Sequence, residues 1–139
     1  METCQLQKDI PVICVTAVSF PEGIMGAFQK LNALLPSTTG RTMYGISYMG
    51  TDGKIVYKAA ASELQSGEAT SSCCESYLIK KGDYISERIN DFMKDTSVIG
   101  KTFQAMLDDP RIDRNGACIE WYINPKDVIC MVRLQENTK

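Results

Sequence analysis

The chain has 139 residues, a formal net charge of −2, 44% hydrophobic residues and 23% charged residues, which is the composition of one ordinary globular domain and excludes collagen-like repeats and long disordered tracts. No apolar run reaches the roughly 20 residues of a membrane-spanning helix, and residues 1–10 are too polar for a signal peptide. Lysine and arginine are scattered along the sequence, so a direct nucleic-acid partner is not expected.

The first half of the chain predicts the element order strand, helix, strand, strand. Residues 12–18 are apolar and β-branched, which is typical of a strand. Residues 19–22 (Ser-Phe-Pro-Glu) fit the cap and first turn of a helix, which Pro36 would end. Residues 42–49 and 54–61 then predict two strands joined by a glycine-containing hairpin turn.

The second half predicts the same order after a connecting loop at residues 62–72, which has little apolar content. A helix is expected to begin near residues 95–97, where Asp, Thr and Ser can all act as caps, and to end before Pro110. The remaining strands are predicted at residues 77–79, 84–89, 117–123 and 128–134.

Two short identities indicate that the halves are copies of one unit. Phe28-Gln29 recurs 75 residues later as Phe103-Gln104, and the turn residue Asp52 recurs as Asp127 at the same offset. Because the element order repeats as well, we predict an internal duplication within a single domain. The domain would cover residues 1–139, with a first repeat at about 1–62, a linker at about 63–74 and a second repeat at about 75–139.

This order of elements predicts an α+β fold. Tandem duplicated β-α-β-β units would form an antiparallel sheet with two helices on one face. Similar halves would be related by a pseudo-two-fold axis and would leave a central cleft where they meet. Clefts at such junctions are favoured places for small ligands.

The absence of histidine from the sequence narrows the chemistry available to this domain. Without imidazole there is no Ser-His-Asp triad, no Cys-His dyad and no histidine ligand for zinc or haem. The six cysteines include no C-x-x-C pair, and Cys14, Cys118 and Cys130 lie in apolar strand-like runs. We therefore expect reduced thiols in a cytoplasmic protein, with no metal and no cofactor.

Residues 116–124 (Gly-Ala-Cys-Ile-Glu-Trp-Tyr-Ile-Asn) carry the densest chemical signal. The period-two geometry of a strand separates this segment into two faces. One face would carry Cys118, Glu120 and Tyr122, placing a carboxylate beside a phenol and a thiol at the cleft. The other face is apolar and is expected to pack beneath the helices, with Ala117, Ile119, Trp121 and Ile123.

Residues 77–134 resemble the second half of the GyrI-like (gyrase-inhibitor-like) small-molecule-binding domain, which is also the effector-binding part of AraC-type and MerR-type bacterial transcription regulators. The stretch Ile79–Tyr84 (IKKGDY), the stretch Ile119–Tyr122 (IEWY) and the final strand Ile129–Leu134 carry the resemblance. The first half matches by element order. The resemblance implies that Glu120 lies in the central cleft and holds cationic, lipophilic or aromatic ligands.

One departure from that family concerns DNA binding. Family regulators carry a helix-turn-helix segment before this domain, whereas here the repeated unit begins within the first dozen residues. We therefore expect a free-standing effector domain without its own DNA-binding segment.

Aromatic side chains are expected to complete the binding site around Glu120. A partly buried carboxylate is costly unless a positive group meets it, and aromatic faces attract a desolvated cation. The candidates are Tyr122 on the same face, Tyr44 and Tyr48 on the equivalent strand of the first half, and Phe20 at the helix entry. The alternative interpretation is that Glu120 faces water and that the tyrosines are ordinary sheet residues.

Three functions are compatible with these features. The first is a module that senses or sequesters a cationic or amphipathic aromatic molecule. The second is a hydrolase of strained electrophiles, because some members of the family that this chain resembles hydrolyse cyclopropane-bearing toxins. In such an enzyme Glu120 would be the general acid-base and Tyr122 would orient the substrate. The third is a protein-interaction module that inhibits a partner protein through its surface, as the namesake of the family does. Separately, a homodimer of the chain is left open. None of the three needs a membrane.

Overall fold

The computed structural model describes residues 1–136 of the chain, and the fold within this range is α+β, as predicted. The helical elements are α1 (Ile24–Leu34), α2 (Glu68–Ser71), the 3-10 helix η1 (Phe92–Lys94) and α3 (Ser97–Leu107). The strands are β1 (Glu2–Leu6), β2 (Ile10–Thr16), β3 (Met43–Met49), β4 (Ile55–Ser62), β5 (Glu75–Ile79), β6 (Gly82–Ile89), β7 (Cys118–Tyr122) and β8 (Val128–Arg133). All eight strands join one antiparallel sheet in the order β1-β6-β8-β7-β3-β4-β2-β5.

The strand order is symmetric about the centre of the sheet. Each strand of the first half corresponds to one strand of the second half: β1 to β5, β2 to β6, β3 to β7 and β4 to β8. When corresponding strands are exchanged, the order read from one edge becomes the order read from the other edge. The first strand of each half pairs with the other half, because β1 lies on β6 and β5 lies on β2. At the centre, β3 and β7 join the halves. This arrangement supports a pseudo-two-fold axis between the halves, while the boundaries of the two repeats stay a prediction.

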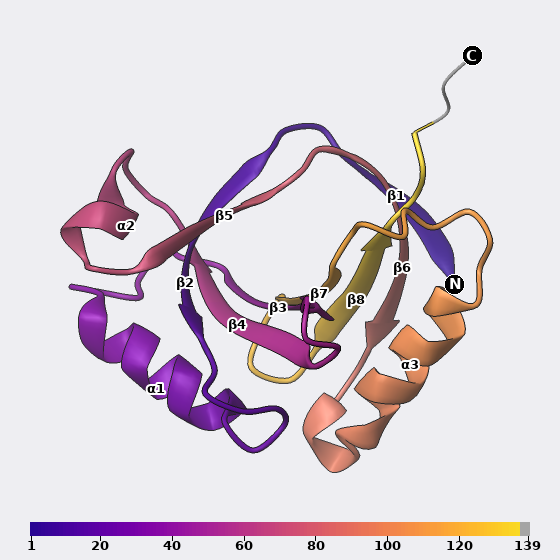
Figure 1. Cartoon of the computed structure of the whole chain (residues 1–139), viewed down its shortest axis with the longest axis horizontal. Helices are drawn as coiled ribbons and strands as arrows, with labels where there is room; N and C mark the ends of the chain where they lie inside the picture. The colour runs from indigo at the N-terminus through magenta and orange to yellow at the C-terminus, as the bar shows by residue number, and fades with distance from the viewer. Residues whose placement is uncertain (137–139) are drawn as a thin grey trace.

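The two long helices lie on the same face of the sheet, as predicted (Figure 1). On α1, Ala27 and Leu31 are buried against Ile13 of β2 and Ala59 and Ala61 of β4. On the other side, α3 buries Phe103 and Met106 against side chains of β6 and β8, namely Ile85, Cys130 and Val132. Each helix therefore covers one half of the sheet, and the strands at the centre lie between them (Figure 1).

The opposite face of the sheet curls around a core of its own (Figure 1). Side chains from the strands of both halves meet in this core, among them Val12, Tyr44, Ile46, Tyr84 and Met131. The apolar side of β7 belongs here, since Ala117 and Ile119 are buried in this cluster and Trp121 packs against it. The expectation that this side packs beneath the helices is therefore wrong. Alternation divides a strand into two faces, but it does not tell which is covered by helices when the curled sheet buries both.

Three elements were not expected from the sequence: β1, α2 and the single-turn η1. β1 is a five-residue edge strand with only two apolar residues, Cys4 and Leu6, which pack partly buried against the core inside the curl, so its pattern is too short to reveal it. α2 lies in the predicted loop and is fixed by Arg41, whose nearly buried guanidinium donates two hydrogen bonds to the Glu68 carboxylate at 2.7 and 3.1 Å. These hydrogen bonds hold the pKa of Glu68 down at about 2.

The entry into α1 also differs from the prediction. The helix begins at Ile24, Gly23 is its N-cap, and no side chain caps it. Ser19 instead accepts a backbone hydrogen bond from Gly23, in a turn that precedes the helix. Within residues 1–136, no helix combines the length and the hydropathy that crossing a membrane requires.

Candidate functional site

The carboxylate of Glu120 lies at the centre of the sheet, on the face that carries the two long helices. Two phenols hold it: Tyr57 of β4 donates to Oε1 at 2.7 Å, and Tyr122 of β7 donates to the same atom at 2.6 Å. No hydrogen bond to Oε2 is found within the described part of the chain, and no fully buried polar side-chain atom there lacks a partner. Oε2 therefore remains accessible from outside.

A glycine between the two strands makes the Tyr57 contact possible. Gly45 of β3 is the register partner of Glu120, and Tyr57 reaches across it from the next strand. A Cβ atom at Gly45 would collide with both the Tyr57 hydroxyl and the Glu120 carboxylate. This close approach, and not an unusual backbone angle, explains why glycine stands at this position.

Aromatic rings surround the two phenols. Phe20 stacks on Tyr57 with ring centroids 5.9 Å apart, and Phe28 of α1 meets Tyr57 and Tyr122 edge-on at 6.3 and 6.0 Å. Phe92 of η1 contacts Tyr122 from the other side at 5.5 Å. These separations are those of favourable aromatic pairs. The rings leave the carboxylate in largely apolar surroundings.

The electrostatic state of Glu120 follows from these surroundings. Burial raises the pKa of the carboxyl above its ordinary value, and the hydrogen bonds from Tyr122 and Tyr57 only partly oppose this. Burial and the nearby Glu120 also raise the pKa of both phenols, so they stay protonated donors at neutral pH. None of the ion pairs among residues 1–136 involves Glu120. The carboxylate is thus poised to meet a positive group.

A pocket of about 750 Å³ opens beside this group, between α1 and η1. Its wall is mostly apolar and aromatic, with Tyr122 linking it to Glu120 through the phenol hydrogen bond. Its methionine and aromatic lining consists of Met25, Phe28, Met43, Phe92, Met93 and Tyr122. This size and lining are typical of small-molecule sites.

Four of the six predicted site residues lie on the helix-covered face. Glu120 and Tyr122 form the central hydrogen bond, and Phe20 reaches it through Tyr57. Cys118 shares the Glu120 face but packs towards the cluster beneath α3, where burial raises its pKa to about 11. Cys118 is therefore a neutral thiol at the flank of the site.

Tyr44 and Tyr48 are placed differently from what was expected. Tyr44 pairs in register with Trp121, and Tyr48 lies four residues further along β3, so both point to the face opposite Glu120. Tyr44 is buried in the core inside the curl, and Tyr48 packs against that core. Their assignment to the wall around Glu120 is corrected, because the even-numbered residues of β3 share a face with Trp121 and not with Glu120.

Four residues of the site were not found from the sequence: Gly45, Tyr57, Phe28 and Phe92. Tyr57 is separated from Glu120 by one whole strand, and only the pairing register brings them together. Helical periodicity assigns Phe28 to the core stripe of α1, although its ring faces the two phenols. A usable signal is Gly45 itself, since a glycine inside a predicted strand marks a close approach, but the groups for which it leaves room follow only from the pairing register.

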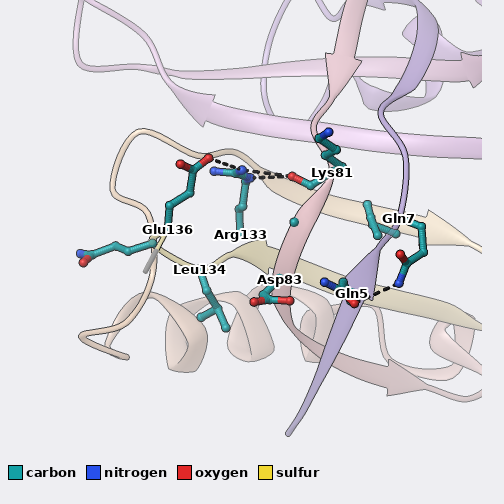
Figure 2. A pocket seen from close by; sticks show the side chains of 10 residues that line it. Gln5, Gln7, Lys81, Asp83, Arg133, Leu134 and Glu136 are labelled. Atoms are coloured by element: carbon teal, nitrogen blue, oxygen red, sulfur yellow. Dashed lines mark hydrogen bonds and ion pairs between the residues drawn. The ribbon is translucent and has the colours of Figure 1, made fainter. Parts of the chain in front are cut away.

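A second hollow lies at the edge formed by β1 and β6 (Figure 2). It is polar, and its Arg133 and Glu136 side chains pair with each other. Arg133 donates to the Lys81 carbonyl at 3.0 Å and to Glu136 at 3.0 Å, as Figure 2 shows. Among the described residues, no aromatic side chain lines it. The pocket beside Glu120 is therefore the stronger candidate.

The described part of the chain contains no group of three or more Cys, Asp or Glu side chains placed to hold a metal ion. All six cysteines are free thiols.

Comparison with known proteins places the fold. No protein-family model and no curated protein sequence matches this chain. Among solved structures, the integron cassette protein VCH_CASS2 from the mobile metagenome of Vibrio cholerae matches with a TM-score of 0.70 and 15% identity, over 96% of this chain and 95% of that one.

Two further solved structures share the fold. SAV2435, solved with bound tetraphenylphosphonium, matches with a TM-score of 0.68 and 11% identity, over 96% of this chain and 93% of its own. A hydrolase from Listeria innocua matches with a TM-score of 0.62 and 12% identity, over 96% of this chain and 90% of its own. At these identities the likeness shows the fold.

The raised pKa of Glu120 predicts a stability effect with a definite sign. A carboxyl whose pKa is higher in the folded state favours folding while it is protonated, and this contribution is lost as the pH rises through the folded-state pKa. We therefore expect Glu120→Gln to raise the melting temperature at pH 8, and to change it much less at pH 4, where wild-type Glu120 is neutral as well. Thermal unfolding of both proteins across this pH range tests the prediction. A variant less stable than wild type at pH 8 would contradict it.

Proposed function

We propose that this protein binds small lipophilic cations in the pocket beside Glu120, and that it serves as a cytoplasmic sensing or sequestering module. One observation carries the proposal. The Glu120 carboxylate is surrounded by aromatic rings, is hydrogen-bonded by two phenols, and has no cationic partner within residues 1–136.

This arrangement is costly in the absence of a ligand. A carboxylate removed from water is unfavourable unless a positive charge compensates it. Tyr57 and Tyr122 both bind Oε1, so they fix the group while leaving Oε2 free for a ligand. A cation beside these rings also gains cation–π attraction, worth about 0.5–2 kcal/mol per ring.

The other charged side chains of the pocket wall also favour a positively charged ligand. Arg41 contributes to the wall, but its guanidinium is already neutralised by Glu68 in a two-point contact. Glu22 lies at the wall as well, and no ion pair of the described residues involves it. The pocket therefore presents net negative charge.

The bound tetraphenylphosphonium of SAV2435 supports the proposal, since that protein has the same fold and its ligand is a bulky aromatic cation. The sequence resemblance to the GyrI-like domain points to the same class of ligand. Both concern other proteins, so the proposal depends on the site geometry above.

A matched pair of ligands tests the proposal. Methyltriphenylphosphonium and triphenylphosphine oxide have the same three rings, but only the first is charged. In calorimetric titrations at pH 8 we expect the cation to bind at least about tenfold more tightly, because the cation alone meets the Glu120 carboxylate. Equal binding of the two, or no binding of the cation, would refute the proposal.

A hydrolase function is the second candidate, favoured by the raised pKa of Glu120 and by the hydrolase from Listeria innocua that shares this fold. Glu120 would take a proton from a water molecule as the water oxygen bonds to one carbon of a strained ring, and would return that proton to the carbon of the broken bond. Tyr122 would orient the substrate.

Mass spectrometry of a cyclopropane electrophile incubated with the protein tests the hydrolase function. A product heavier by one water molecule that is no longer formed by Glu120→Gln supports hydrolysis. If wild type forms no such product, the result argues against hydrolysis.

The inhibitor module stays a prediction of the sequence, since neither the pocket nor the aromatic group around Glu120 calls for a protein partner.

A further inference from the structure

Two methionines from different elements contribute to the wall of the pocket beside Glu120. Met25 belongs to α1 and Met93 to η1, and both line the pocket. Their side chains are unusually exposed for large apolar residues, at 69% and 70%. The phenylalanines of the same two elements, Phe28 and Phe92, contact Tyr122 at the inner end. The pocket thus has an aromatic inner part and outer walls formed by methionine.

Exposed methionines at a pocket wall have a physical consequence for binding. Each keeps apolar surface in contact with water, and a ligand that covers it gains the free energy of removing that surface from water. Methionine has three flexible side-chain torsions and a polarisable sulfur, so it adapts to ligands of different shape and packs well on aromatic rings. Residues of this kind suit a surface that must accept several bulky molecules.

The size of the pocket indicates which ligands would reach these side chains. Its volume is about 750 Å³, and the enclosed carboxylate, Glu120, lies at the inner end behind Tyr122, whereas Glu22 of the wall is exposed to water. A cation with one ring would be held there by Glu120 and the aromatic rings alone. A cation with several rings must extend outwards and contact both methionines.

We propose that Met25 and Met93 form an adaptable clamp that makes the pocket selective for bulky, multi-ring lipophilic cations over small ones. The inference rests on the proposed function, because it concerns the same site. Glu120 selects the charge of the ligand, and the methionine clamp, Met25 and Met93, selects its bulk. The two selections are separable because they use different parts of the pocket.

The test compares two cations on the full chain. Methyltriphenylphosphonium carries three rings, and phenyltrimethylammonium carries one. We expect wild type to bind the three-ring cation more tightly, and Met25→Ala/Met93→Ala to raise its Kd by about tenfold, because both truncations remove apolar contacts. The Kd of phenyltrimethylammonium should change by less than about twofold, since the inner site is intact.

Met49→Ala is the matched control. Met49 is exposed to a similar extent, at 64%, but it lies at the end of β3 and does not line this pocket. It should leave both affinities unchanged. All three methionines are exposed, so the variants are expected to fold, and their melting temperatures verify this.

The outcomes separate the clamp from the proposed function. If wild type binds neither cation, the proposed function fails and the clamp fails with it. If wild type binds both cations through Glu120 but the double variant keeps wild-type affinity for the three-ring cation, the clamp alone is refuted. Equal losses for both cations in the double variant would also refute it, because the methionines would then not discriminate by bulk.

Discussion

Glutamine at position 120 should weaken the binding of methyltriphenylphosphonium by roughly 100-fold, which corresponds to about 2.7 kcal/mol of binding free energy. The reason is that, among the described residues, Glu120 supplies the enclosed negative charge directly behind Tyr122, whose ring lines the pocket together with Phe28. The raised pKa of Glu120 shows how poorly its surroundings compensate that charge when no ligand is bound. A cation removes this penalty, and it cannot do so in the variant.

Glutamine is the informative replacement because it changes the charge and little else. Its amide oxygen can still accept the hydrogen bonds that Tyr57 and Tyr122 donate to Oε1. The variant should also be more stable than wild type at pH 8, so a loss of binding could not be ascribed to unfolding. The neutral triphenylphosphine oxide serves as an internal control, since its weak binding should be the same in both proteins.

A second carboxylate provides the matched control variant. Glu22→Gln makes the same chemical change at the pocket wall, where the side chain is exposed to water. Exposed charges contribute little, so its effect should stay below about threefold. Calorimetric titration of wild type and both variants measures the three affinities. Comparable losses for the two variants would show that net charge, and not the enclosed position of Glu120, attracts the ligand.

The affinity should also depend on pH in a direction set by Glu120. A bound cation stabilises the charged carboxylate and so lowers its pKa, which means that binding releases a proton where the free carboxyl is protonated. The wild-type affinity for the cation therefore increases with pH until Glu120 is ionised, and then levels off. The Gln variant lacks this dependence.

Much of the fold could be predicted from local patterns. The hairpins β3–β4 and β7–β8 follow from β-branched runs separated by turn residues, and both long helices follow from apolar periodicity. The edge strand β1 carries only two apolar residues, which is too few for a clear pattern, and the short α2 depends on the distant Arg41. Local signals fail where an element is fixed by partners far along the chain.

The site was predictable only along its own strand. Alternation correctly places Glu120 and Tyr122 on one face of β7, since both lie on a single strand. It fails for Tyr44, because the face that β3 shares with Glu120 depends on the pairing register, which was not known. Tyr57 is hidden for the same reason, as it approaches from a strand that does not pair with β7.

Register also explains the role of Gly45, which we expect to be the residue most sensitive to a small change. Gly45 pairs with Glu120 and lies 75 residues before it, the offset of the predicted repeat, so the pseudo-two-fold axis would pass between them. Equivalent positions of the two halves thus face each other across the axis. A side chain at both positions would crowd the centre of the sheet, and the glycine leaves room for one carboxylate and for the phenol of Tyr57.

Gly45→Ala should therefore destabilise the protein by about 1–3 kcal/mol, because its methyl group collides with the Tyr57 hydroxyl and the Glu120 carboxylate and must displace one of them. Gly100→Ala in α3 is the control: its Cβ meets nothing within 4 Å, and removing a helical glycine should stabilise by up to about 1 kcal/mol. Chemical denaturation measures both changes. A double-mutant cycle with Tyr57→Phe tests whether the added methyl group competes with the Tyr57 hydroxyl. Tyr57→Phe alone should lower the stability, because a hydrogen bond is lost. Combined with Gly45→Ala it should lower the stability less, or even restore it. Strictly additive effects of the two substitutions would mean that the methyl group and the phenol do not compete for the same space.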